Sequence, residues 1–142
     1  MSTEAAFKSW FDGQGFRNFK AGELTWYFGK VRSGVSNDYP PRLLWPNIVP
    51  TIRILDRLRD HLGRPITLTS TYRAPAYNRA IGSPDGSMHR QFRAADFQVA
   101  GVDPRDVAAV LKLWRDSGDF RGGIGTYRTF VHLDTRAGNA TW

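Results

Sequence analysis

The chain has 142 residues, of which 41% are hydrophobic and 23% charged, an ordinary composition for one globular domain of roughly 100–200 residues. Cysteine is absent, so disulfides and thiolate metal sites are excluded and a metal would need His, Asp or Glu ligands. The formal net charge of +7 favours a polyanionic partner such as nucleic acid or an anionic cell wall. The basic residues are scattered along the chain, which argues against a dedicated nucleic-acid-binding arm.

The N-terminal segment has no basic region followed by an apolar run, so no signal peptide is predicted. No apolar stretch approaches the length of about 20 residues that crosses a bilayer. We therefore expect synthesis in the cytoplasm and no membrane insertion. Residues 1–45 are rich in aromatic side chains and interrupted by Gly and Pro. We expect them to pack as short elements onto the core of a single domain that spans residues 1–142.

Helices are predicted where apolar residues recur at helical spacing. The first such pattern covers residues 48–62 and stops at Gly63, a typical residue after the end of a helix. A short helix is predicted over residues 74–81. Another begins after Asp103, which suits the N-cap position, and continues to about Trp114.

Strands are predicted where apolar and β-branched residues alternate, at 66–72 and 94–100. Two further strands are predicted at 122–127 and 129–134. The connection between them is so short that we expect a hairpin. Helices mixed with strands that are joined partly by short turns are typical of an α+β fold. We expect a mainly antiparallel sheet flanked by helices.

The chain has three histidines, and two of them are candidate metal ligands. His61 lies near the end of a predicted helix, among charged residues, as a solvated histidine would. His89 precedes the strand that carries Asp96, and His132 lies in a later apolar strand. Two imidazoles and one carboxylate would leave a fourth position open for water, as in catalytic zinc sites. The residues alone also allow packed, hydrogen-bonded histidines, or a site for iron or manganese.

Three segments form an ordered set of motifs. Residues 70–78 read Ser-Thr-Tyr-Arg-Ala-Pro-Ala-Tyr-Asn, and residues 87–96 read Ser-Met-His-Arg-Gln-Phe-Arg-Ala-Ala-Asp. The glycine-rich segment 122–127 is followed by Phe-Val-His-Leu-Asp-Thr-Arg at 130–136. Together they resemble the zinc D-alanyl-D-alanine carboxypeptidase family, which cleaves peptidoglycan and includes phage endolysins. The second segment resembles its Ser-x-His-(x)6-Asp signature, and the third resembles a subfamily that carries His-x-Asp.

The resemblance implies a hedgehog/DD-peptidase-like fold with Zn2+ bound by His89, Asp96 and His132. It also implies that Arg73 points into the cleft, where its planar, charged side chain would bind a carboxylate or carbonyl oxygen of the substrate. Ser87 would orient its loop or donate a hydrogen bond to the substrate.

The chain departs from the family pattern in two places. The family usually has Gly where Phe92 stands, which predicts a narrowed cleft or an altered loop. Many members also place an acidic residue or His shortly before the last ligand as general base, whereas residues 127–130 contain none. Asp134 is the best replacement, because it shares a strand face with His132. It would either accept a proton during catalysis or orient a histidine ligand.

The expected function is zinc-dependent hydrolysis of peptide bonds in peptidoglycan stem or cross-link peptides, as a D,D-carboxypeptidase or endopeptidase. Because the usual base is missing, the alternative is a non-catalytic module of the same fold that binds cell walls. We expect a monomer whose partners are peptidoglycan peptides and not nucleic acid. Such a protein would act at the cell wall, after release by a phage holin or as part of a virion.

Overall fold

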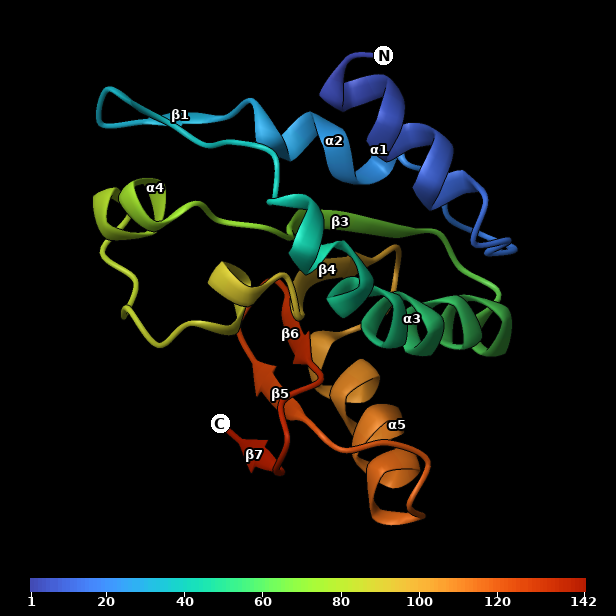
Figure 1. The fold of residues 1–142 in the computed structure, drawn as a ribbon. Helices are drawn as coiled ribbons and strands as arrows, with labels where there is room; N and C mark the ends of the chain where they lie inside the picture. Colours follow the sequence, from blue (N-terminus) through green and yellow to red (C-terminus); the bar gives the residue numbers. More distant parts are fainter.

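A five-stranded sheet forms the centre of the computed structural model, which describes residues 1–142 (Figure 1). Its strand order is β3-β4-β6-β5-β7. The bounds are Ile66–Ser70 for β3, Ala94–Val99 for β4, Gly123–Thr126 for β5, Val131–Asp134 for β6 and Ala140–Thr141 for β7. All pairings are antiparallel except that of β5 with β7. The predicted α+β fold with a mainly antiparallel sheet is therefore confirmed.

Helices pack against this sheet, and a separate two-stranded ribbon follows α2 and lies beside α4 (Figure 1). The α-helices are α1 (Thr3–Asp12), α2 (Gly22–Phe28), α3 (Val49–Leu62), α4 (Pro75–Ala80) and α5 (Pro104–Asp116). The 3-10 helices are η1 (Arg42–Ile48) and η2 (Met88–Gln91), and the ribbon consists of β1 (Val31–Arg32) and β2 (Val35–Ser36). Helix α2 packs against β3, and α5 packs against β5. None of the helices has the length and apolarity that spanning a bilayer would require.

The predicted cap residues lie at the end of α3 and at the start of α5, and α5 continues two residues beyond the predicted Trp114, to Asp116. Gly63 follows α3 with a left-handed φ of 63°, and its N–H donates to the carbonyl of Arg59. Such a conformation is easily adopted by glycine, which has no Cβ to clash. At the start of α5, the Asp103 side chain accepts a hydrogen bond from the N–H of Arg105. These caps satisfy backbone groups that the helices leave without partners.

The first 45 residues form the short elements α1, α2, β1, β2 and the start of η1, and the sequence pattern had not identified α1 and α2 as helices. Ser2 caps α1, and Phe7 and Phe11 are fully buried on its inner face. Phe28 of α2 meets Phe7 edge to face, with 5.4 Å between ring centroids. The aromatic residues of this segment therefore form part of the same core that carries the central sheet.

Phe92 lies in the core and not in a cleft. Its φ of 55° is left-handed, a conformation that glycine adopts readily. Its side chain is 0% exposed and packs against Phe7, Phe28 and Tyr72. The expectation that Phe92 narrows the cleft is wrong, because the ring packs inward against the aromatic residues of α1 and α2 and does not line the cleft.

Candidate metal centre

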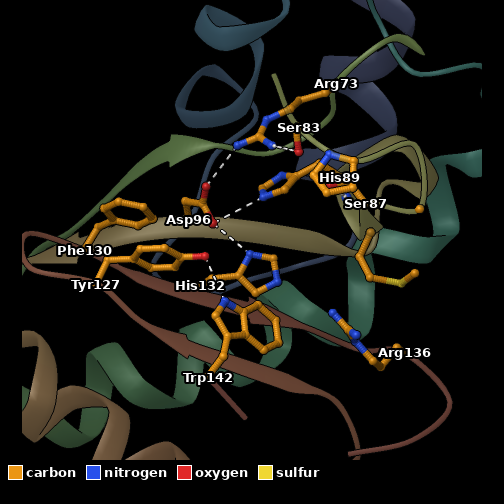
Figure 2. Close-up of a pocket in the computed structure, with 13 residues that line it drawn as sticks. Arg73, Ser83, Ser87, His89, Asp96, Tyr127, Phe130, His132, Arg136 and Trp142 are labelled. Atoms are coloured by element: carbon orange, nitrogen blue, oxygen red, sulfur yellow. Dashed lines mark hydrogen bonds and ion pairs between the residues drawn. The ribbon is translucent and has the colours of Figure 1, made fainter. Parts of the chain in front are cut away.

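The central strand pair brings the three predicted ligands together. Asp96 on β4 stands directly opposite His132 on β6 in the antiparallel register. His89 lies in η2, which precedes β4, and its ring centroid is 5.2 Å from that of His132. One ligand atom from each of these three buried residues lies within 4.8 Å of the other two (Figure 2).

His89 is fixed in the tautomer that leaves one nitrogen free. Its Nδ1 lies 2.6 Å from the carbonyl oxygen of Thr71. A carbonyl only accepts, so Nδ1 carries the proton and donates it to that oxygen. The other nitrogen, Nε2, therefore presents a lone pair, and it lies 3.2 Å from Oδ1 of Asp96.

His132 faces the cluster through its other ring nitrogen, Nδ1. Its Nε2 lies 2.7 Å from Oδ2 of Asp134 and donates its proton to that carboxylate. Its Nδ1 lies 2.9 Å from Oδ1 of Asp96. A cation at this point would replace the proton between His132 Nδ1 and Asp96, and it would meet two imidazole nitrogens and a carboxylate oxygen. This nitrogen and oxygen donor set fits zinc.

The surroundings set the protonation of these groups. Burial lowers the pKa of His89. Burial would raise the pKa of Asp96, but its interactions with His89 and His132 outweigh that effect and hold the pKa well below its usual range. For His132, burial is outweighed by hydrogen bonds to Asp134 and Asp96, which raise its pKa. Asp96 is therefore ionised at neutral pH and favours a positive charge between the imidazoles.

Asp134 lies behind His132, with no exposed surface. Its carboxylate accepts hydrogen bonds from the backbone N–H of Gly123 at 2.9 Å and from Arg136 Nε and NH2 at 2.9 and 2.7 Å. Burial would raise the pKa of Asp134, but the hydrogen bonds from Arg136 and His132 outweigh it and lower the pKa. Of the two roles open for Asp134, these contacts favour the orientation of His132 over proton transfer in the cleft.

Arg73 lines the cleft and also contacts the predicted ligand Asp96. Its guanidinium donates to Oδ2 of Asp96 at 3.2 Å and to the hydroxyls of Ser70 and Ser83 at 3.2 and 3.3 Å (Figure 2). Arg73 thus contacts Oδ2 of Asp96, while Oδ1 faces the two imidazoles. Ser87 also lines the cleft, and its hydroxyl accepts a hydrogen bond from the N–H of His89 at 3.2 Å.

The ligands form the floor of an open cleft of about 560 Å³. Asp96 is its one acidic lining residue, whereas Arg73 and Arg136 both border it. Tyr127 and Trp142 also line the cleft, and sequence reasoning did not assign either of them to the site. One signal was available, since glycines within a strand often mark a place where another group approaches the backbone closely.

A buried His-Asp-His cluster at the floor of an open cleft is the arrangement expected of a metal-dependent hydrolase. The family model for peptidase M15 matches residues 17–134, which include all three ligands. A search of curated proteins finds no match. The chain belongs to the peptidase M15 family, so the resemblance seen in the sequence is confirmed. Family and cluster together imply a metal-dependent peptidase.

Proposed function

We propose that this chain hydrolyses peptide bonds in peptidoglycan stem or cross-link peptides, with zinc as its metal. The observation that carries the proposal is the convergence of His89 Nε2, Asp96 Oδ1 and His132 Nδ1 at the floor of the cleft. The cluster borders a hollow of about 560 Å³, within the range of cavities that hold small ligands. Membership of the peptidase M15 family supports the reaction class.

The residues of the chain have separate tasks in this reaction. His89, Asp96 and His132 would hold the zinc, while Asp134 and the carbonyl of Thr71 keep the two imidazoles in the required tautomers. Bound zinc supplies an acidified water and a polarised scissile carbonyl.

Arg73 holds Asp96 and presents a fixed positive charge to the cleft. We expect it to bind a carboxylate or carbonyl oxygen of the peptide. Asp134 offsets the charge of Arg136, which it contacts in a bidentate ion pair. With zinc bound, the cleft is therefore positive overall, which supports a substrate that carries free carboxylates, as peptidoglycan stem peptides do.

The proposal is tested by incubating the zinc-loaded protein with purified peptidoglycan and counting new free amino groups. We expect release by the wild type and by His61→Ala, because His61 is exposed and does not belong to the cluster. We expect none from His132→Ala. The masses of the released fragments would show whether terminal residues or cross-links are cut. A folded, zinc-loaded wild type that releases no amino groups would overturn the proposal.

One observation favours a second candidate, a module that binds cell walls without cleaving them. The cleft is lined by no carboxylate or imidazole apart from the three ligands, so no separate side chain of the usual kind is available as general base. In this case the zinc-loaded protein would sediment with cell walls and release no amino groups. Sedimentation together with release would instead support the enzyme.

A further inference from the structure

One wall of the cleft is built from two aromatic side chains, Tyr127 and Trp142 (Figure 2). The backbone of Trp142 continues the parallel pairing of β7 with β5. Its N–H donates to the carbonyl of Ile124 at 3.1 Å, and its carbonyl accepts from the N–H of Thr126 at 2.8 Å. The indole lies against Gly125, where an added Cβ would be 2.6 Å from Nε1. The position of the indole is therefore fixed by the backbone pairing of Trp142 with β5 and by the absence of a side chain at Gly125.

The indole orients the hydroxyl of Tyr127. Trp142 Nε1 lies 2.8 Å from Tyr127 Oη, and an indole N–H can only donate. The phenol oxygen is therefore the acceptor in this bond, and its own O–H remains free to donate elsewhere. The Tyr127 ring is also stacked on Phe130, with 4.4 Å between centroids and 5° between planes. Phe130 thus positions the ring of Tyr127, and Trp142 positions its hydroxyl oxygen.

This hydroxyl lies beside the metal cluster. The centroid of the Trp142 ring is 5.0 Å from that of His132. The indole therefore lies between the Tyr127 phenol and one of the predicted metal ligands. Figure 2 shows the Tyr127 hydroxyl pointing toward Asp96 and His132, while Arg73 lies on the other side of Asp96. A peptide carbonyl at the cluster would thus have a neutral donor on one side and a cationic donor on the other.

We propose that Tyr127 is a catalytic residue that donates a hydrogen bond to the carbonyl oxygen of the scissile amide as this oxygen becomes an oxyanion, with Trp142 as its positioning residue. This inference rests on the proposed peptidase function. The water oxygen adds to the carbonyl carbon, and the π electron pair of the C=O bond moves onto the oxygen. That pair re-forms the C=O bond as the C–N bond breaks. The leaving nitrogen takes up the proton that the water loses, and Tyr127 keeps its own proton throughout.

The direct test is Tyr127→Phe, which retains the ring stacked on Phe130 and removes only the hydroxyl. We expect kcat to fall about 10²-fold, since removing one preorganised donor to an oxyanion typically costs 10²–10³-fold. We expect KM, zinc content and Tm to be unchanged. Tyr39→Phe is the matched control, because that ring packs against Phe7 and Phe28 and does not line the cleft. A Tyr127→Phe variant with the wild-type kcat would overturn the inference.

A double-mutant cycle tests the positioning role of Trp142. Trp142→Phe removes the N–H donor and leaves the phenol free to rotate, so we expect kcat to fall. Once the hydroxyl is gone, its orientation no longer matters. The double variant should therefore have the same kcat as Tyr127→Phe alone. Multiplicative losses would show that Trp142 acts independently of Tyr127 and would overturn its role.

Binding of a phosphinate peptide, measured by calorimetry on the zinc-loaded protein, separates this inference from the proposed function. The tetrahedral, anionic phosphinate mimics the oxyanion. Tyr127→Phe should therefore bind it about 10²-fold more weakly than the wild type. Absence of turnover in the wild type would count against the peptidase function. Equal phosphinate affinities of the two proteins would instead overturn the role of the hydroxyl.

Discussion

Each histidine of the predicted metal site has a second hydrogen-bond partner on the ring nitrogen that faces away from the cluster. The Thr71 carbonyl takes the Nδ1 proton of His89, and the Asp134 carboxylate takes the Nε2 proton of His132. Without these partners, each imidazole would populate both tautomers and often present the protonated nitrogen to the metal. At the scale of single residues, the metal centre is thus defined by the groups behind the ligands as well as by the ligands.

Replacement of Asp134 tests this arrangement. In Asp134→Ala the Nε2–H of His132 loses its acceptor, and we expect zinc affinity to fall about 10–100-fold. The affinity is measured by competition with a fluorescent zinc chelator. Asp116→Ala serves as the control, because Asp116 is exposed at the end of α5. Equal zinc affinities of the two variants would show that Asp134 does not orient the ligand.

The sequence indicated the three ligands but not their orientation. The spacing of His89 and Asp96 and the position of His132 in a strand were visible as motifs, and family resemblance added their role. The burial of Asp134 could not be read from the sequence. Residues two apart in a strand share a face, and only the packing of the folded chain decides which of them is exposed to solvent. The two-residue spacing therefore allowed both a base and an orienting group.

At the scale of elements, Asn37 links helix α2 to the loop after β3 that carries Arg73. Its side chain is buried, with 6% of the residue exposed. Its amide nitrogen donates to the carbonyls of Tyr27 and Tyr72 at 3.2 and 2.9 Å. Its amide oxygen accepts from the N–H of Ala74 at 2.9 Å. The two residues that flank Arg73 are therefore held by one buried side chain from the segment after β2.

We expect Asn37→Ala to reduce the free energy of unfolding by about 3 kcal/mol, at about 1 kcal/mol for each of the three lost hydrogen bonds. Urea unfolding followed by tryptophan fluorescence would measure the change. Asn47→Ala is the matched control, because the Asn47 side chain makes a single hydrogen bond, to the carbonyl of Gln91. If both variants lose the same free energy of unfolding, Asn37 does not link α2 to the loop that carries Arg73.

Elements with strong periodicity were predictable, whereas those defined by distant contacts were not. Helix α3 follows from apolar residues at helical spacing and from Gly63 after its end. Strand β7 has only two residues, Ala140–Thr141, too few to show an alternating pattern. It exists because its backbone pairs with β5, a contact that no local pattern encodes.

At the scale of the whole molecule, the metal would join parts of the chain that are distant in sequence. His89 and His132 lie on either side of α5 in the chain, and both meet Asp96. An ion bound by the folded state alone stabilises that state, by about 2.7 kcal/mol when its concentration is 100 times Kd. Bound zinc should therefore increase the free energy of unfolding of the whole domain.

Calorimetry of the chelator-treated protein tests this effect. For a chain of this length, zinc at 100 times Kd should raise Tm by roughly 8 °C, given about 3 °C for each kcal/mol. Calcium at the same concentration is the control, since it prefers six to eight oxygen ligands and should leave Tm unchanged. An identical Tm with and without zinc would mean that no zinc site forms in the folded protein.

The central claim is that His89, Asp96 and His132 bind one metal ion together, and the most direct test is the zinc content of dialysed proteins by mass spectrometry. Wild type and His61→Ala should each retain one zinc per chain. His89→Ala and His132→Ala should retain almost none, although they remain folded by circular dichroism. A full equivalent of zinc in either of these two variants, or none in the wild type, would contradict the claim.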